Sequence, residues 1–197
     1  METFIMVLLL VTSIVSLAFI LERSLALRWN RVIPRAVESS VETCKDKNQL
    51  PALRKICEAN PSPIGRLLLV AANHLDCPKP ENIDALQTKA RHEVAGMERG
   101  LVVLEIITGI APLLGLVGTI FGLILLFNSI GADGTAENQA QFAGGIALAL
   151  RATLMGLLVA IPSLIFWSYF NKKVDTLAVE METICDEFLQ RYYRTNR

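Results

Sequence analysis

Three stretches of the chain are almost free of charged residues, and each has the length of a helix that crosses a membrane. They cover residues 3–21, 106–132 and 142–171, and Arg151 is the one charged residue in them. A helix needs about 20 mostly apolar residues to cross the hydrocarbon core of a bilayer. The pattern therefore predicts an all-α integral membrane protein with three transmembrane helices.

The first stretch has an alternative interpretation as a cleaved signal peptide. However, Glu2 stands before the apolar run, and no lysine or arginine precedes it. Glu22 and Arg23 follow the run directly. A signal peptide has a basic segment before its apolar core. The sequence therefore favours a membrane-anchoring helix over residues 1–22.

Apolar residues also recur at three- and four-residue steps beyond the second and third stretches. The stripe before the second stretch consists of Ile83, Leu86, Ala90, Val94, Met97 and Leu101. The stripe after the third consists of Val174, Leu177, Val179, Met181, Ile184, Phe188 and Leu189. This spacing predicts two long helices, over 81–130 and 141–192, joined by a polar turn over 131–140. Six prolines between residues 34 and 80 predict several short helices in the segment 23–80.

The distribution of basic residues predicts how the chain is oriented in the membrane. Four arginines follow the first stretch (Arg23, Arg28, Arg31 and Arg35), and Lys172 and Lys173 follow the third. The 131–140 turn contains Asp133 and Glu137 and no basic residue. Basic residues near membrane helices stay in the cytoplasm. We therefore expect the N-terminus and the turn outside, and the segment 23–80, both long helix extensions and the C-terminus inside.

Composition and motifs argue against several other classes of protein. The residues are 52% hydrophobic and the formal net charge is zero, so no basic surface for nucleic acid is indicated. The four cysteines are too widely spaced for a zinc site or a disulfide framework, and we expect reduced thiols. The sequence has no Walker-type glycine loop, no GxSxG and no HExxH. No enzyme, metal or cofactor is predicted.

Small and hydroxyl-bearing residues lie within the second and third stretches. Gly115, Gly118 and Gly122 share one helix face, which either allows close helix packing or borders a pore. Thr119 and Thr153 lie at similar depth, each roughly ten residues, or about 15 Å, from the outer turn. Their hydroxyls either bond back to the preceding helical turn or line a hydrated path.

Arg151 is the unusual charge within the third stretch. An arginine at the centre of a membrane helix costs about 2.5–3.5 kcal/mol, which predicts that it faces a cavity, water or a partner charge. Alternatively, its long side chain reaches outward to the membrane surface. On a helix it shares a face with Ala147 and Leu148, roughly opposite Thr153.

Three motifs in these stretches resemble one known family. Residues 111–122 read APLLGLVGTIFG, residues 145–153 read GIALALRAT, and residues 156–162 read GLLVAIP. Together they look like the ExbB/TolQ/MotA proton-channel family, over roughly residues 94–175. The resemblance includes the three-span topology and the spacing of the two inner spans.

The resemblance implies an assembly and a mechanism. Members form a ring of five subunits around two copies of a single-span partner of the ExbD/TolR/MotB kind, in the bacterial inner membrane. An aspartate on the partner's helix carries the proton, and proton flow drives rotation of one part inside the other. By motif, Thr119 and Thr153 match the pore threonines, while Pro112 and Pro162 match the intramembrane prolines.

The chain departs from the family pattern at two positions. ExbB and TolQ members often carry glutamate where this chain has Leu148, and an apolar residue where it has Arg151. Both positions belong to the pathway that the resemblance implies, where Arg151 could favour the ionised form of a partner carboxylate. The missing glutamate supports the alternative of a non-conducting membrane scaffold. A channel without a partner is disfavoured, because no acidic residue lies in 106–132 or 152–171.

Overall fold

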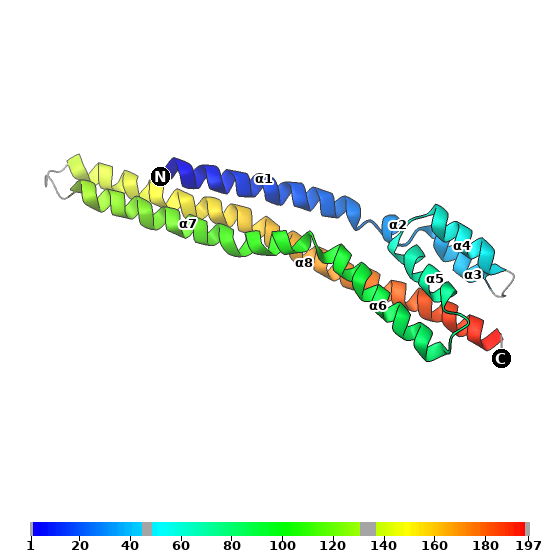
Figure 1. Ribbon diagram of the computed structural model, residues 1–197. Coiled ribbons are helices and arrows are strands. Elements are labelled where there is room, and N and C mark those ends of the chain that lie inside the picture. Colours follow the sequence, from blue (N-terminus) through cyan, green and yellow to red (C-terminus); the bar gives the residue numbers. More distant parts are fainter. Residues whose placement is uncertain (1, 45–48, 131–136, 196–197) are drawn as a thin grey trace. The chain divides into compact units, whose positions relative to one another are not determined.

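The computed structural model describes residues 2–44, 49–130 and 137–195, and all regular secondary structure in these ranges is helical. Side chains are described for these residues except 2, 3, 129, 130, 137–143, 148 and 195. The helices are α1 (Glu2–Ala26), α2 (Trp29–Val32), α3 (Arg35–Thr43), α4 (Leu50–Ala59), α5 (Pro63–Asn73), α6 (Lys79–Glu98), α7 (Leu101–Ile130) and α8 (Glu137–Thr195) (Figure 1). The prediction of an all-α protein is confirmed.

The chain divides into two compact units. The first contains Met1–Arg23 and Gly100–Tyr169, and therefore most of α1, all of α7 and the first part of α8. The second contains Ser24–Arg99 and Phe170–Arg197, with α2 to α6 and the last part of α8.

Three of the described helices are long and apolar enough to cross a membrane. Their apolar ranges are Phe4–Ala26, Leu101–Asn128 and Gly144–Arg194. In the most apolar window of each helix, only 22%, 22% and 24% of the residues are buried. Most of the apolar surface is therefore available to lipid or to other subunits, as expected for a membrane protein.

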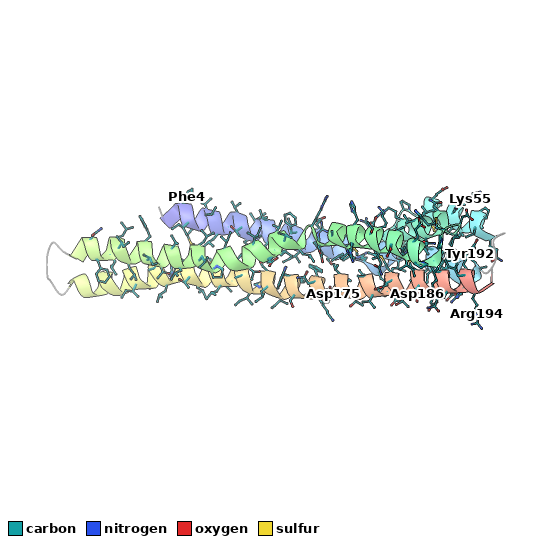
Figure 2. The ribbon with its side chains drawn as sticks, turned by 60° about the horizontal axis from the view of Figure 1, so that its bottom comes forward. Phe4, Lys55, Asp175, Asp186, Tyr192 and Arg194 are labelled. Carbon is teal, nitrogen blue, oxygen red and sulfur yellow. The ribbon has the colours of Figure 1, made fainter. Side chains whose placement is uncertain are left out.

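The first unit is a bundle in which α1 lies beside the antiparallel pair of α7 and α8 (Figures 1 and 2). One face of α1 is buried against this pair, and its members are Ile5, Leu9, Ser16 and Ile20. Phe4 belongs to the opposite face, is 66% exposed and points away from the bundle (Figure 2). Between α7 and α8, Ile107, Ala111 and Ala160 form a buried cluster.

A buried pair of serines joins α1 to α8. The hydroxyl oxygens of Ser16 and Ser163 lie 2.6 Å apart, and the two residues are 4% and 0% exposed. Ser163 Oγ also lies 2.8 Å from the Val159 carbonyl oxygen, which accepts its proton in the usual back-bond of a helical serine. Ser16 Oγ then donates to Ser163. Among the described side chains, Ser163 is the one partner of this hydroxyl.

This asymmetry leads to an unequal effect of two single substitutions. Ser16→Ala leaves Ser163 with its carbonyl acceptor and should cost about 0.5 kcal/mol of unfolding free energy. Ser163→Ala leaves the buried Ser16 hydroxyl without its acceptor and should cost about 1–2 kcal/mol of unfolding free energy. The double variant removes both polar groups and should be more stable than Ser163→Ala alone. SDS-induced unfolding in mixed micelles measures all three; equal costs for the two single variants would contradict this account.

The predicted long helix over 81–130 is interrupted at Arg99 and Gly100, where α6 ends and α7 begins. A Cβ atom on Gly100 would collide with Nε of Arg23, so the absent side chain leaves room for this guanidinium. Glycine also weakens a helix by about 1 kcal/mol relative to alanine. The apolar periodicity on both sides of the break gave no sign of it.

Two other predicted boundaries differ from the structure. The first membrane helix, predicted over 1–22, continues to Ala26. Residues 131–136 of the predicted 131–140 turn lie outside the described residues, and residues 137–140 belong to α8. The last long helix therefore begins four residues before the predicted position 141 and ends at Thr195 instead of 192.

The second unit buries the apolar stripe of the last part of α8. Val174, Leu177, Met181, Phe188 and Leu189 are each at most 1% exposed, as their spacing predicted. Val179 was also assigned to this stripe, and that assignment is wrong because its side chain is 63% exposed. It lies two residues, or about 200° of helix rotation, from both Leu177 and Met181. Asp175, Asp186 and Arg194 are likewise exposed along α8 (Figure 2).

The stripe on α6 is less completely covered. Ile83, Ala90 and Val94 are half-buried and border a groove of about 630 Å³ between α6 and the last part of α8. Polar contacts hold the surrounding helices together. Asn82 Nδ2 donates to the Ala71 carbonyl at 3.0 Å, and salt bridges join Glu93 of α6 to Arg66 of α5 and to Lys89.

All four cysteines lie among the described residues, and none of them forms a disulfide there. Burial raises the pKa of the Cys57 thiol to about 11. The thiol is therefore protonated at neutral pH, and a thiol is a much weaker nucleophile and metal ligand than a thiolate.

Candidate functional site

The helices α7 and α8 approach each other closely where glycines replace side chains. A Cβ atom on Gly115 would lie 2.8 Å from the Ala152 carbonyl oxygen, and one on Gly156 would lie 2.5 Å from the Ala111 carbonyl oxygen. A Cβ atom on Gly118 would lie 2.6 Å from the Ala152 methyl group. Small residues at such positions let helix backbones come into contact. The contact fixes how the neighbouring polar side chains of the two helices meet.

Thr119 of α7 and Thr153 of α8 meet at this contact. Their hydroxyl groups are hydrogen-bonded to each other. Thr119 Oγ1 also lies 3.2 Å from the carbonyl oxygens of both Gly115 and Ala149, and Thr153 Oγ1 lies 3.3 Å from the Gly115 carbonyl oxygen. Both threonines are half-buried. The structure therefore brings together the two hydroxyls that the sequence singled out at similar depth.

The number of protons decides what this pair can bind. Each threonine hydroxyl has one proton to donate and two lone pairs. If Thr119 donates to Thr153, then Thr153 donates to the Gly115 carbonyl; in the reverse arrangement Thr119 donates to a carbonyl. In either arrangement both protons are used inside the protein and three lone pairs are left. The pair can therefore accept another hydrogen bond without losing one, whereas donating outward costs it a carbonyl contact.

Both threonines lie within a stretch that matches a known protein family. Residues 59–183 match the MotA/TolQ/ExbB proton channel family, a range that contains all of α7 and the membrane part of α8. The chain belongs to the MotA/TolQ/ExbB family. The sequence motifs around Pro112, Thr119 and Thr153 predicted this membership, and the match confirms it. Helix α1 lies before the matched range.

Relatives with ExbB names come from distant organisms. A putative biopolymer transport protein ExbB-like 1 of Synechocystis is 39% identical over 166 residues, which are 80% of this chain and 63% of the relative. A putative ExbB homolog of Methanothermobacter thermautotrophicus is 30% identical over 77% of this chain and 53% of the relative. ExbB of Aquifex aeolicus is 36% identical over 53% of this chain and 70% of the relative. The chain thus spans less than two thirds of the first two of these relatives.

The prolines that the resemblance singled out and the three glycines of α7 differ in how deeply they are buried. Pro112 is half-buried inside α7, and Pro162 is exposed inside α8, without either helix ending there. Gly115, Gly118 and Gly122 are all buried. For Gly115 and Gly118 the close contacts with α8 account for the small side chain, which was one of the two interpretations of the pattern.

Arg151 is exposed and is not part of the threonine pair. It lies two residues, or about 200° of rotation, from Thr153 on α8, so the two side chains leave the helix on opposite sides. The side chain of Leu148, where ExbB and TolQ members often have glutamate, lies outside those that the structure describes.

Two features of this region were not predicted from the sequence. The first is the buried Ser16–Ser163 contact, because isolated serines in apolar helices carry no sign of which helix they face. The second is the role of Ala111 and Ala152, whose backbone carbonyls and methyl group contact the glycines. The sequence signal of this contact is a four-residue step between small residues, alanine included: Ala111 with Gly115, and Ala152 with Gly156.

Proposed function

We propose that the chain is the channel subunit of a membrane motor that converts the proton-motive force into mechanical work. Five copies would form a ring around two copies of a single-span partner of the ExbD/TolR kind, whose membrane aspartate carries the proton. The proposed location is the bacterial inner membrane, with the N-terminus and the turn before α8 in the periplasm. The segment 23–80, the extensions of the two long helices and the C-terminus would then lie in the cytoplasm.

The Thr119–Thr153 pair is the observation that carries this proposal. A protonated aspartic acid donates a hydrogen bond, and the pair has lone pairs to accept it while one of its own protons stays in the bond between the two hydroxyls and the other is donated to the carbonyl of Gly115 or Ala149. An ionised aspartate has no proton to donate, so it could interact only by taking a hydroxyl proton away from a carbonyl. The pair therefore favours the proton-loaded form of the partner's acid, which is the form that crosses an apolar region most easily.

Two surfaces support assembly with further copies and a partner. Most apolar residues of the three membrane helices are exposed within the chain, including Leu113, Val117 and Ile120 of α7. In the second unit, the groove along Ile83 and Val94 is lined mainly by apolar residues. A ring of copies would bury both kinds of surface.

Arg151 and Leu148 also belong to the proposed pathway, and Arg151 lies on another side of α8 than Thr153. Since Arg151 leaves α8 opposite Thr153, its guanidinium is available to a carboxylate of the partner or of a neighbouring copy. An adjacent positive charge favours the ionised form of an acid. Arg151 would thus promote proton release, whereas the threonine pair would promote proton uptake.

Proton flux through the reconstituted complex tests the role of the pair. The full chain and its single-span partner are placed in vesicles with an internal pH-sensitive dye, and a pH gradient is imposed. Replacing both hydroxyls by methyl groups in Thr119→Val/Thr153→Val keeps the shape but removes the acceptors. Losing hydrogen bonds worth about 1 kcal/mol each should lower the flux roughly tenfold or more.

Thr108→Val is the matched control. Thr108 also lies on α7, but among the described residues its hydroxyl bonds only to the Leu104 carbonyl of its own helix, at 2.9 Å. Its replacement should leave the flux unchanged. An unaltered flux in the Thr119/Thr153 double variant would overturn the proposed role of the pair. A wild-type complex that conducts no protons at any gradient would favour the non-conducting scaffold instead.

A further inference from the structure

Exposed arginines flank an exposed tryptophan in the sequence immediately after α1. Between residues 23 and 37 the chain has four arginines and no acidic residue, although its net charge is zero. Arg28, Arg31 and Arg35 are all exposed, and Trp29 is 44% exposed. We call these four residues the arginine–tryptophan surface. Its positive charge is local and is not balanced within the segment.

The arginine–tryptophan surface is held in place by buried neighbours on both sides. Leu27 is 1% exposed, Val32 2% and Ile33 0%, so the segment is anchored in the second unit. Backbone hydrogen bonds from Arg31 N to Arg28 O and from Ile33 N to Trp29 O form the short helix α2. The exposed side chains are therefore presented on an ordered turn, which lowers the entropy that binding has to overcome.

The three arginines have the chemistry of a phosphate site. Within the described part of the chain, none of Arg28, Arg31 and Arg35 forms an ion pair. Arginine binds phosphate through two parallel N–H···O contacts, and several arginines can bind the same phosphate group in this way.

The position of this surface in the chain selects a lipid as the source of the phosphate. The apolar range of α1 ends at Ala26, only two residues before Arg28. Tryptophan and arginine are typical of the interface between the hydrocarbon core and the headgroups. Leu25, 52% exposed, adds an apolar side chain for the acyl region. Basic clusters directly after a membrane helix attract anionic lipids.

We propose that the arginine–tryptophan surface binds the headgroup phosphate of an anionic phospholipid in the leaflet where α1 ends. Arg28, Arg31 and Arg35 contact the phosphate, and the Trp29 indole lies among the headgroups beside it. The site does not involve the threonine pair, so it stands independently of proton conduction. The proposal differs from the role of these arginines in orienting the chain during insertion. That role requires neither Trp29 nor a preference for one lipid after insertion.

Quenching of Trp29 fluorescence by brominated lipids tests the proposal. The full chain carries Trp167→Phe, which leaves Trp29 as its one tryptophan. It is placed in nanodiscs of phosphatidylcholine with a minority of brominated phosphatidylglycerol, or of brominated phosphatidylcholine. Nanodiscs expose both membrane faces, so the direction of insertion does not affect the signal. We expect brominated phosphatidylglycerol to quench about fivefold more effectively, and high salt to reduce this preference.

Three variants locate the preference. Arg28→Gln/Arg31→Gln/Arg35→Gln should abolish it, while the corresponding lysine triple, which keeps the charge, should retain most of it. Lys55→Gln/Arg91→Gln/Arg194→Gln removes three exposed positive charges elsewhere in the second unit and should leave it unchanged. Equal quenching by both lipids in the wild-type chain would overturn the proposal. The proposal would also be overturned if the preference survives the arginine-to-glutamine triple or is lost in the control triple. Loss of the preference on addition of free inorganic phosphate would overturn it as well.

Discussion

Gly156→Ala is expected to lower the unfolding free energy by about 2 kcal/mol, whereas the same change at Gly109 should raise it by up to about 1 kcal/mol. A Cβ atom at position 156 would lie 2.5 Å from the Ala111 carbonyl oxygen and 3.1 Å from Gly115 Cα. Both are backbone atoms, which cannot rotate away as a side chain could. The helices would have to separate, and separation would also pull Thr153 away from Thr119.

Gly109 is a suitable control because it lies in α7 and, apart from its chain neighbours and the nearby backbone of its own helix, no atom comes within 4 Å of a Cβ placed there. At such a position alanine gains its ordinary advantage in helix propensity without a steric cost. Gly144→Ala on α8 provides a second control with the same free space. SDS-induced unfolding of the purified variants in mixed micelles gives the sign directly. If Gly156→Ala and Gly109→Ala shift the unfolding midpoint in the same direction, the close contact of α7 and α8 is not what holds them together.

The sequence allowed prediction of those features that depend on composition and period. Long uncharged runs predicted the apolar helices, because no other local structure satisfies its backbone polar groups in a membrane. Three- and four-residue steps predicted the buried face of the last part of α8, from Val174 to Leu189. Val179 was misassigned because an isolated apolar residue near a stripe looks like a member until its angle around the helix is considered.

Features that depend on one side chain meeting a distant one could not be predicted in this way. The break before α7 exists where the side chain of Arg23 occupies the space beside Gly100, 77 positions later in the chain. The pairing of Ser16 with Ser163 is another example, since apolar periodicity does not tell one serine from its neighbours. Depth along the spans placed Thr119 and Thr153 at the same level, but only the close approach at Gly115 and Gly156 brings their hydroxyls into contact.

The salt bridge of Glu93 should make the second unit less stable in acid, and Glu93→Gln should remove this dependence. The Glu93 carboxylate is 9% exposed and accepts hydrogen bonds from Arg66 Nε at 2.9 Å and Arg66 Nη2 at 2.6 Å; Lys89 Nζ lies 3.0 Å away. The hydrogen bonds from Arg66 hold the pKa of Glu93 below its ordinary value, against the opposing effect of burial.

The direction of this shift fixes the pH range. An unfolded chain has a glutamate pKa of about 4.3, and in the folded protein the Glu93 pKa is lower. The stabilisation is therefore fully present above about pH 4.3 and is lost as the pH falls through the folded pKa. At neutral pH we expect Glu93→Gln to cost about 2 kcal/mol, less than for a fully buried pair because Arg66 is 45% exposed.

The measurement is the difference in unfolding free energy between wild type and Glu93→Gln from pH 7 down to pH 3. It should be largest at neutral pH and shrink below about pH 4.3. Glu187→Gln is the control, since Glu187 pairs with Arg191 on the exposed side of α8 and should contribute at most about 0.5 kcal/mol. A constant difference across the pH range would mean that Glu93 acts through its shape and not through its charge. A cost at Glu187 as large as that at Glu93 would mean that burial of the carboxylate between α5 and α6 adds nothing.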